Sequence, residues 1–376
     1  MRLLAAAIFA PKNQLHLEGR TIKTIDLKQY GYLGTETIPE GMLVGRITEV
    51  QRNQYTVMTE QGEMLAVLRG SFLYHAKERS DFPCVGDFVL LRPSSSGVSR
   101  IEKLLSRHSK FSRADFSGHA VAYVKMIKEQ VVATNFDYVF ILTSLNWDFK
   151  VSRVLRYLTQ ARQSGGEPVV ILTKADLTTD YSAYLAQVQQ AEPDVKIHAI
   201  SSHTGEGLAA LDSYLQPGKT IVFLGMSGVG KSSLLNALMK QEVMGVKTIR
   251  EEDSRGRHMT THRQLFMLPS GAMVIDTPGM RELGLYGADE GINEGFADLA
   301  ELFAECCFSD CRHNNEPGCA VLAALQDGTL PKERWERYLA QKRENAFVDH
   351  KSAHIREQSA RLKAMAKQSK KKGGNH

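Results

Sequence analysis

The stretch Gly225-Met-Ser-Gly-Val-Gly-Lys231-Ser232 has the GxxxxGK[ST] spacing of a phosphate-binding loop. It follows an apolar run at 220–224 and leads into helix formers at 233–238, so we expect a strand, a glycine-rich turn and a helix. Glycines let consecutive backbone N–H groups turn inward around phosphate oxygens, and the N-terminal end of the helix adds positive charge. A plain glycine-rich turn between a strand and a helix is the alternative.

In the phosphate-binding interpretation, Lys231 reaches the β- and γ-phosphates of a nucleotide and the Ser232 hydroxyl binds Mg²⁺. The residues expected around the phosphates are Gly225, Met226, Ser227, Gly228, Val229, Gly230, Lys231, Ser232 and Ser233. The stretch Asp276-Thr-Pro-Gly279 adds a DxxG turn at the end of another apolar run, where an open α/β sheet binds its ligand. Its carboxylate can bind Mg²⁺, and the Gly279 N–H can meet the γ-phosphate.

A further motif, Thr173-Lys174-Ala175-Asp176, matches the [NT]KxD element that selects guanine. The Asp176 carboxylate would accept hydrogen bonds from N1–H and N2–H₂ of guanine, a donor pair that adenine lacks at that edge. Lys174 would pack its stem over the ring, and the pair Ser201-Ser202 resembles the short loop that contacts guanine O6. By itself the motif could be a strand-end turn with Asp176 as a helix N-cap. Beside a phosphate-binding loop and a DxxG turn, coincidence explains it poorly.

The chain around these motifs alternates apolar and amphipathic runs, which predicts βαβ units and a mostly parallel sheet. We expect strands at 136–143, 168–176, 196–202, 220–224, 265–268 and 272–276. We expect helices at 150–162, at 181–190, in a run that ends near 215, and after the phosphate-binding loop. The guanine motifs precede the phosphate-binding loop, the reverse of the usual order. Joining the old ends and opening a new break leaves such a pocket intact, so the sequence predicts a circular permutation.

The N-terminal third has a different pattern. Five short β-patterned runs at 42–48, 54–58, 63–68, 87–91 and 98–101 fit a small closed barrel of the OB type, a fold that commonly binds nucleic acid. A barrel that serves only as a spacer is the alternative. The stretch from Lys103 to Lys128 mixes cations with aromatic rings, which suits single-stranded nucleic acid or a charged linker.

A Cys/His cluster follows the DxxG turn. Cys306, Cys311, His313 and Cys319 supply three thiolates and one imidazole, a complete tetrahedral set for structural zinc. Cys307 would be the spare, and buried free cysteines are the alternative. We expect a helix over 320–339 to pack on this site. Five cysteines in 376 residues, four of them clustered, indicate a reducing compartment rather than a disulfide framework.

Charge and hydropathy limit the remaining possibilities. The net charge is +5, and residues 341–376 carry ten Lys or Arg against three acids, as a solvated tail or a phosphate-seeking arm would. No stretch approaches the roughly 18 apolar residues that span a bilayer. The apolar run at 3–10 has the length of a short signal core, but no clear cleavage site follows it, and we favour a poorly ordered N-terminal extension.

Together, the permuted motifs between an OB-like region and a Cys/His cluster resemble the ribosome small subunit-dependent GTPase A family, over about residues 35–350. The resemblance implies GTP hydrolysis to GDP and phosphate, stimulated by the small ribosomal subunit, a late role in maturing that subunit, and contact with its rRNA. We accordingly expect a cytoplasmic monomer that uses Mg²⁺ and one structural Zn²⁺, with no membrane partner.

The family's switch region corresponds to 247–263. We favour Thr261 as the hydroxyl that binds Mg²⁺ when the γ-phosphate is present, with Thr260 next. Met280 stands where many such enzymes place a glutamine that orients the attacking water, and a thioether cannot do so by hydrogen bonding. His258 matches the histidine proposed for that role in similar proteins, although a histidine that contacts rRNA or is merely exposed is the alternative.

The expected fold is thus a multi-domain chain with an N-terminal OB-type β-barrel, a central circularly permuted α/β P-loop GTPase domain and a C-terminal helical zinc-binding domain. The boundaries we expect are 1–34 for the extension, 35–105 for the barrel, 106–130 for a basic linker, 131–290 for the GTPase domain, 291–350 for the zinc domain and 351–376 for the tail. Two rival functions are an RNA-binding checkpoint factor with negligible GTP turnover and a P-loop ATPase or nucleotide kinase, which the TKAD motif disfavours.

Overall fold

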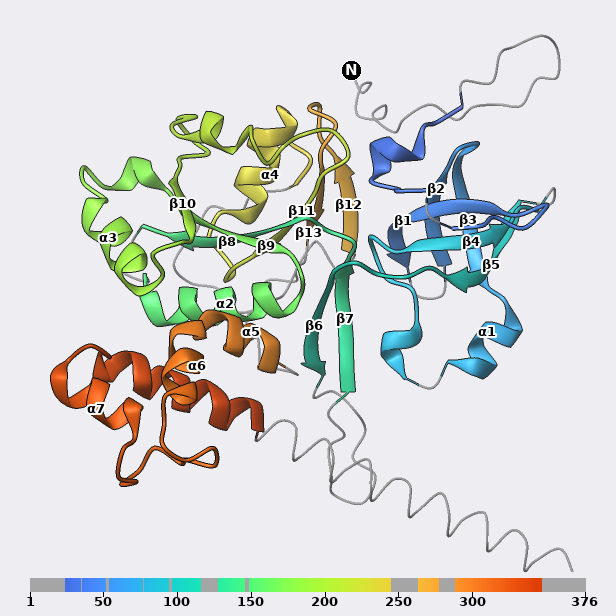
Figure 1. Ribbon diagram of the computed structural model, residues 1–376. Helices are drawn as coiled ribbons and strands as arrows, with labels where there is room; N and C mark the ends of the chain where they lie inside the picture. The colour runs from blue at the N-terminus through green and yellow to red at the C-terminus, as the bar shows by residue number, and fades with distance from the viewer. Residues whose placement is uncertain are drawn as a thin grey trace, which may run out of the picture.

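The structure is a computed structural model in which a barrel and a helix-covered sheet lie side by side, with a smaller group of helices packed below the sheet (Figure 1). The residues that the structure describes are 24–34, 36–51, 54–76, 78–94, 97–115, 128–145, 149–244, 263–276 and 288–346. None of the helices in these ranges combines the length and the apolar character needed to cross a membrane.

The barrel has the five strands expected from the sequence. They are β1 (Leu43–Gln51), β2 (Gln54–Thr59), β3 (Gly62–Leu68), β4 (Phe88–Arg92) and β5 (Val98–Leu104). Pairing runs β1-β2-β3-β5-β4, and β4 also pairs with β1, so the barrel closes. Inward residues such as Ile47, Val57 and Ile101 are fully buried and fill the interior. The closed five-stranded barrel fits an OB-fold. The short helices α1 (Gly70–His75) and η2 (Arg79–Asp81) lie between β3 and β4.

The second part is an open sheet in the order β10-β9-β8-β11-β13-β12. Its strands are β8 (Tyr138–Ser144), β9 (Glu167–Thr173), β10 (Lys196–Ala199), β11 (Thr220–Leu224), β12 (Arg263–Met267) and β13 (Met273–Asp276). All pairs are parallel except β12–β13. The central strand β11, which leads into the phosphate-binding loop, has β8 on one side and β13 on the other. One neighbour thus comes before β11 in the chain and the other after it. This arrangement is the one expected of a permuted chain.

Both faces of this sheet are covered, which explains its continuous apolar runs. Val139 and Ile141 of β8 pack toward one face with α2 (Val151–Gln163) and α3 (Ser182–Ala191), while Phe140 and Leu142 pack toward the other with α4 (Lys231–Met239). The alternation follows from the two-residue period of a strand. The helix expected to end near 215 is only the 3₁₀ turn η4 (Leu208–Leu211) with irregular turns after it, which corrects that prediction.

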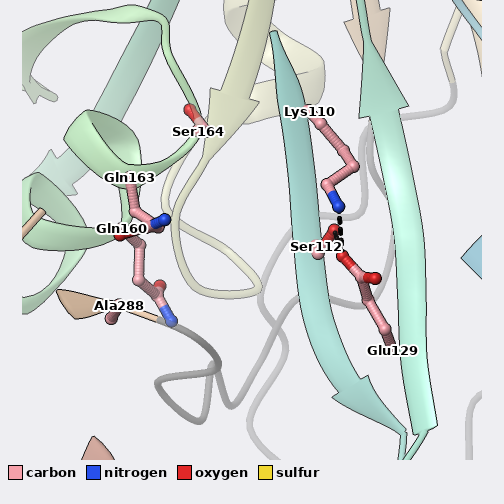
Figure 2. A pocket seen from close by; sticks show the side chains of 7 residues that line it. All are labelled: Lys110, Ser112, Glu129, Gln160, Gln163, Ser164 and Ala288. Atoms are coloured by element: carbon pink, nitrogen blue, oxygen red, sulfur yellow. Dashed lines mark hydrogen bonds and ion pairs between the residues drawn. The ribbon is translucent and has the colours of Figure 1, made fainter. Parts of the chain in front are cut away.

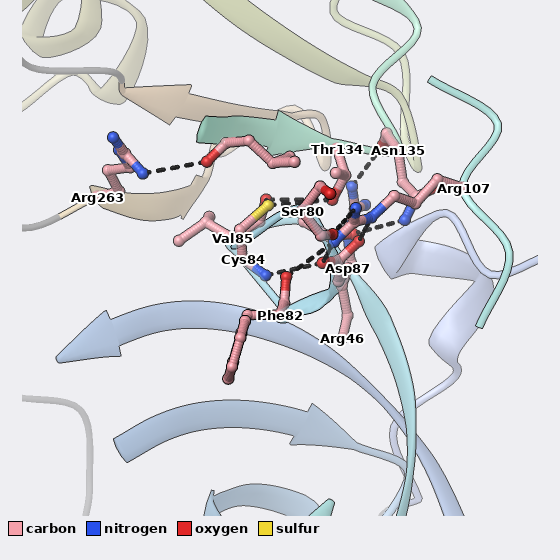
Figure 3. Close-up of polar contacts among 12 residues, drawn as sticks. Arg46, Ser80, Phe82, Cys84, Val85, Asp87, Arg107, Thr134, Asn135 and Arg263 are labelled. Atoms are coloured by element: carbon pink, nitrogen blue, oxygen red, sulfur yellow. Dashed lines mark hydrogen bonds and ion pairs between the residues drawn. The ribbon is translucent and has the colours of Figure 1, made fainter. Parts of the chain in front are cut away.

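The barrel and the sheet are joined directly, because β1 pairs with β12 through Glu49↔Gln264 and Val50↔Arg263. Arg46 of β1 is fully buried at this junction (Figure 3). Its guanidinium carbon lies 5.0 Å from the centre of the Phe88 ring. Arg46 donates hydrogen bonds to the carbonyl oxygens of Tyr30 and Asn135, both at 2.6 Å, and to the Thr220 hydroxyl at 2.9 Å.

A second buried contact lies close to the first. Arg107 donates two hydrogen bonds of 2.7 Å to the buried carboxylate of Asp87 (Figure 3). It also donates to the carbonyl oxygens of Ser80 and Phe82. Paired N–H groups of one guanidinium match the two oxygens of a carboxylate. Residues 24–34, which we expected to be part of a poorly ordered extension, pack on the barrel through η1 (Leu27–Tyr30) and a contact of 5.4 Å between the rings of Tyr32 and Phe88.

Part of the segment expected to be a basic linker forms a separate two-stranded hairpin of β6 (Lys110–Asp115) and β7 (Lys128–Thr134). Phe111, one of the aromatic rings in the stretch from Lys103 to Lys128, is 1% exposed and lies in the core beneath the sheet. It is therefore not available for stacking on a base.

The C-terminal helices are α5 (Asp289–Gly295), α6 (Ala297–Ala304), α7 (Ala320–Asp327) and helical residues 332–346. The continuous helix expected over 320–339 is thus broken, since Gly328 adopts a left-handed φ of 82° and Pro331 follows. These helices dock on α2 of the sheet. Thr159 donates a hydrogen bond of 2.8 Å to Gln341, and Arg156 pairs with Glu344.

Candidate nucleotide-binding and metal-binding sites

The phosphate-binding loop follows β11 and ends where α4 begins at Lys231. Gly225, Gly228 and Gly230 have φ values of 146°, 78° and 107°, a region that side chains with a Cβ rarely adopt. A Cβ at Gly225 would also lie 2.5 Å from the Leu142 carbonyl oxygen of the neighbouring strand. The glycines are therefore needed for the turn itself and for its close packing on β8.

Lys231 directs its ammonium group into this turn. Its Nζ donates to the carbonyl oxygens of Gly225 at 2.6 Å and Met226 at 2.7 Å. Burial lowers the pKa of Lys231 to about 8, and the negative charge of Asp276 partly opposes that shift. Asp276 ends β13, where it is 6% exposed. The cation expected on the phosphates and the carboxylate expected on Mg²⁺ therefore lie within electrostatic reach of each other.

The guanine motif meets the phosphate-binding loop directly. Thr173, the last residue of β9, donates a hydrogen bond of 2.6 Å from its hydroxyl to the Val229 carbonyl oxygen. The chain then turns at Lys174, whose φ of 62° is left-handed, into the 3₁₀ turn η3 (Ala175–Leu177). Lys174, not Asp176, is the N-cap of that turn, so the capping alternative does not account for Asp176. The Asp176 side chain is exposed.

The loop expected to contact guanine O6 lies beside this turn, because the Ala175 N–H donates to the Ile200 carbonyl at 3.0 Å. Ser201 is fully buried, and its hydroxyl accepts hydrogen bonds from the backbone N–H groups of His203 and Thr204. Its side chain thus shapes the loop, and the partly exposed Ser202 is the more accessible of the two.

The switch residues lie elsewhere in the chain. His258, Thr260, Thr261 and Gly279 all fall outside the described residues. Ser232 and Ser233 lie in the first turn of α4, directly after Lys231. The structure thus brings together the phosphate-binding loop, the guanine motif, the 201–202 loop and Asp276 at the carboxyl ends of neighbouring parallel strands.

Cys306, Cys311, His313 and Cys319 form one cluster between α6 and α7, with all four ligand atoms within 4.8 Å of one another. The Cys306 and Cys319 sulfurs are 3.9 Å apart, and His313 Nδ1 lies 3.6 Å from Cys306 Sγ and 3.4 Å from Cys319 Sγ. A tetrahedral zinc with bonds of about 2.3 Å to sulfur and 2.0 Å to nitrogen needs S···S and S···N separations of about 3.8 and 3.5 Å. The donor set and its spacing therefore fit zinc.

Aromatic rings that the sequence analysis did not single out hold this cluster in place. The His313 imidazole stacks on Phe303 at 4.6 Å, and Trp335 meets its edge at 5.8 Å. Cys307 is exposed and contacts Gly318, where a Cβ would lie 2.4 Å from its sulfur. The structure thus keeps Cys307 outside the ligand cluster, as expected for the spare cysteine.

A cavity of about 240 Å³ lies between the β6–β7 hairpin, α2 and the start of α5, and no residue of the phosphate-binding loop lines it (Figure 2). On the hairpin side, Lys110 pairs with Glu129 at 2.7 Å, and Ser112 donates to the same carboxylate. On the helix side, Gln163 accepts a hydrogen bond from the Gly291 N–H. The cavity marks the junction of three parts of the chain rather than the nucleotide site.

Comparison with known proteins identifies the family. The RsgA GTPase family model matches residues 104–286. The small ribosomal subunit biogenesis GTPase RsgA 2 of Lactiplantibacillus plantarum is 43% identical over 328 residues, covering 86% of this chain and 90% of that protein. The corresponding protein of Opitutus terrae is 42% identical, with coverage of 82% and 85%.

Solved structures agree. YjeQ from Thermotoga maritima is 27% identical with a TM-score of 0.58, covering 80% of this chain and 96% of that one. YloQ, described as a circularly permuted GTPase, shares the fold with a TM-score of 0.56 at 23% identity over 84% of this chain and 96% of its own. Because the sheet is permuted and relatives more than 40% identical match this chain over most of its length, the chain belongs to the RsgA GTPase family and is a GTP hydrolase.

Proposed function

We propose that this GTPase acts in late maturation of the small ribosomal subunit, binding that subunit and its rRNA and hydrolysing GTP faster when bound. The curated relatives carry small-subunit biogenesis in their names. The observation that carries the nucleotide part is the 2.6 Å hydrogen bond from Thr173 to Val229, because it joins the guanine motif to the phosphate-binding loop at one sheet edge. We propose that the protein works as a cytoplasmic monomer.

Recognition of the base falls to Asp176 and Lys174 in this proposal. The exposed Asp176 carboxylate accepts from guanine N1–H and N2–H₂, and Lys174 covers the ring. The phosphates lie against the backbone N–H groups of 225–233, with Lys231 moving from its loop carbonyls to the β- and γ-phosphate oxygens. Ser232, Thr261 and Asp276 are the residues that would hold Mg²⁺, which supplies charge neutralisation at the phosphates.

Hydrolysis needs a group that orients water and a donor to the γ-phosphate. The Gly279 N–H is the proposed donor, and His258 is the proposed water-positioning side chain, because Met280 cannot hydrogen-bond a water in the usual way. We propose that His258 positions the water only when the protein is bound to the small subunit, so the free protein hydrolyses GTP slowly. If His258→Ala kept full subunit-stimulated turnover, this role would be wrong.

The C-terminal cluster is proposed to hold one structural zinc through Cys306, Cys311, His313 and Cys319. Three thiolates and an imidazole leave no open position, so the metal stabilises the fold and takes no part in hydrolysis. We propose the division into a barrel at 35–105, a GTPase domain at 131–290 and a zinc domain at 291–350. The barrel and the GTPase domain share one continuous sheet, because β1 pairs with β12.

The test is GTP turnover titrated with purified small ribosomal subunits, with large subunits as the matched control. We expect turnover to rise and saturate with small subunits only. Subunit binding with no turnover would support an RNA-binding checkpoint factor for which GTP is a conformational ligand. Failure of small subunits both to bind and to stimulate would refute the proposed function.

A further inference from the structure

Asn236 lies in the middle of α4, the helix that starts at the phosphate-binding loop, yet its side chain serves residues beyond the end of that helix. Its Oδ1 accepts from the Val243 N–H at 3.0 Å and from the Met244 N–H at 2.9 Å. Its Nδ2 donates to the Met244 carbonyl oxygen at 2.7 Å. One amide side chain therefore satisfies three backbone groups of a non-helical segment.

The neighbouring structure reinforces this attachment. The helix ends at Met239, and the left-handed φ of 55° at the C-cap residue Lys240 reverses the chain so that it returns along α4. Met244 is then 8% exposed and packs in the same core as Leu234 and Leu235. Asparagine is a poor residue for a helix interior, because its side chain competes for backbone hydrogen bonds. Here that tendency is used to hold the returning chain.

The chain held at Met244 leads through 245–262 to Arg263, where β12 begins. The far end is fixed too, because Gln264 is in register with Asp276 of β13 and Arg263 with Val50 of the barrel. Both ends of this stretch are thus attached to elements of the nucleotide site, one to the helix of the phosphate-binding loop and one to the strand beside Asp276. The proposed His258 and Thr261 lie between them in sequence.

We propose that Asn236 is a positioning residue for GTP hydrolysis: it fixes the start of the switch stretch to the helix of the phosphate-binding loop. The inference rests on the proposed roles of Thr261 and His258. Releasing 241–244 would lengthen the connection between α4 and β12 by only about four residues, and closure entropy grows slowly with loop length. Loss of the Asn236 hydrogen bonds would therefore change the position of the switch residues rather than the entropy of the loop. It would weaken binding and hydrolysis of GTP, whose γ-phosphate those residues contact in the proposed function, and leave GDP binding unchanged.

The test compares Asn236→Ala, Asn236→Asp and the control Gln241→Ala, an exposed residue of the same turn. For each full-length variant, affinities for GDP and for a non-hydrolysable GTP analogue with Mg²⁺ are measured, together with kcat. For Asn236→Ala we expect GDP affinity within about twofold of wild type, and GTP-analogue affinity and kcat lower by about tenfold, the scale of one or two lost hydrogen bonds. Asn236→Asp keeps the acceptor for both N–H groups and should lose about threefold.

A merely structural role would give a different pattern. Equal losses of GDP and GTP-analogue affinity, or no change in either, would overturn the proposal. Should Asn236→Ala fail to fold by circular dichroism, Asn236→Asp decides by the same ratio of affinities. The ratio of GTP-analogue affinity to GDP affinity in the wild-type protein tests the proposed Thr261 role separately. If the wild type bound both nucleotides equally well, the Thr261 role itself would be wrong, whatever Asn236 does.

Discussion

Replacement of Arg46 by methionine tests the junction between barrel and sheet. Methionine has a similar length but no charge and no donors, so the Tyr30 and Asn135 carbonyls lose their 2.6 Å partners. The Gly86 carbonyl keeps a donor, because the Asn135 side-chain amide also reaches it at 3.1 Å. The Thr220 hydroxyl also loses its 2.9 Å donor, but a hydroxyl can rotate and donate a hydrogen bond of its own. The change therefore leaves two backbone carbonyls without their charged donor.

The magnitude follows from two opposing terms. Hydrogen bonds from a charged donor are worth about 1.5–3 kcal/mol each, so the two lost bonds cost roughly 5 kcal/mol. Burial lowers the pKa of Arg46 from 12.5 to about 10, against the attraction of Asp137 and Asp87. Removing that buried charge returns ~3 kcal/mol at 1.36 kcal/mol per pKa unit. The net expectation is a loss of about 2 kcal/mol in the free energy of unfolding, which for a chain of 376 residues lowers Tm by about 3 °C.

The assay is thermal and urea denaturation of Arg46→Met beside Arg100→Met, an exposed arginine of β5. The control should change stability by no more than about 0.5 kcal/mol. Buried charges replaced by apolar residues sometimes stabilise a protein. If Arg46→Met were as stable as wild type or more stable, the reasoning that the guanidinium holds barrel and sheet together would be refuted.

Other predictions concern the two sites. Because phosphate oxygens must raise the pKa of Lys231 from about 8, GDP binding should take up a proton above pH 8, and affinity should fall by up to tenfold per pH unit there. Isothermal titration in buffers of different ionisation enthalpy measures that uptake, and an affinity that stays flat to pH 10 would contradict it. Metal analysis should find one zinc per chain. Stripping the zinc should unfold the C-terminal helices with a change in Trp335 fluorescence, whereas a zinc-free protein that stays fully folded would exclude structural zinc.

Much of the fold could be predicted from local pattern. Strands of the open sheet are buried on both faces and form continuous apolar runs in the sequence. The five barrel strands are short β-patterned runs between turn residues. The predicted limits of both sets of strands agree with the observed ones to within a few residues. The phosphate-binding loop was found because the glycines at 225, 228 and 230 are demanded by backbone conformation. The Cys/His cluster was found because four strong ligands rarely gather by chance.

The parts that were missed depend on distant contacts. Arg46 looks like an ordinary strand arginine, and nothing near it in sequence indicates partners at 30, 135, 220 and 273. The sequence predicts a linker where β6 and the start of β7 lie, because the cations there are typical of a solvated segment. Gly328 and Pro331, by contrast, were available signals for the break in the helix expected over 320–339.

Competition between GDP and ADP, in wild type and in Asp176→Ala, tests most directly whether the guanine motif and the phosphate-binding loop close on one nucleotide. The account predicts that GDP displaces a fluorescent guanine nucleotide from the wild type far better than ADP does. It also predicts that Asp176→Ala removes most of that preference while the protein stays folded. An unchanged preference in Asp176→Ala, or equal displacement by the two nucleotides in wild type, would contradict it.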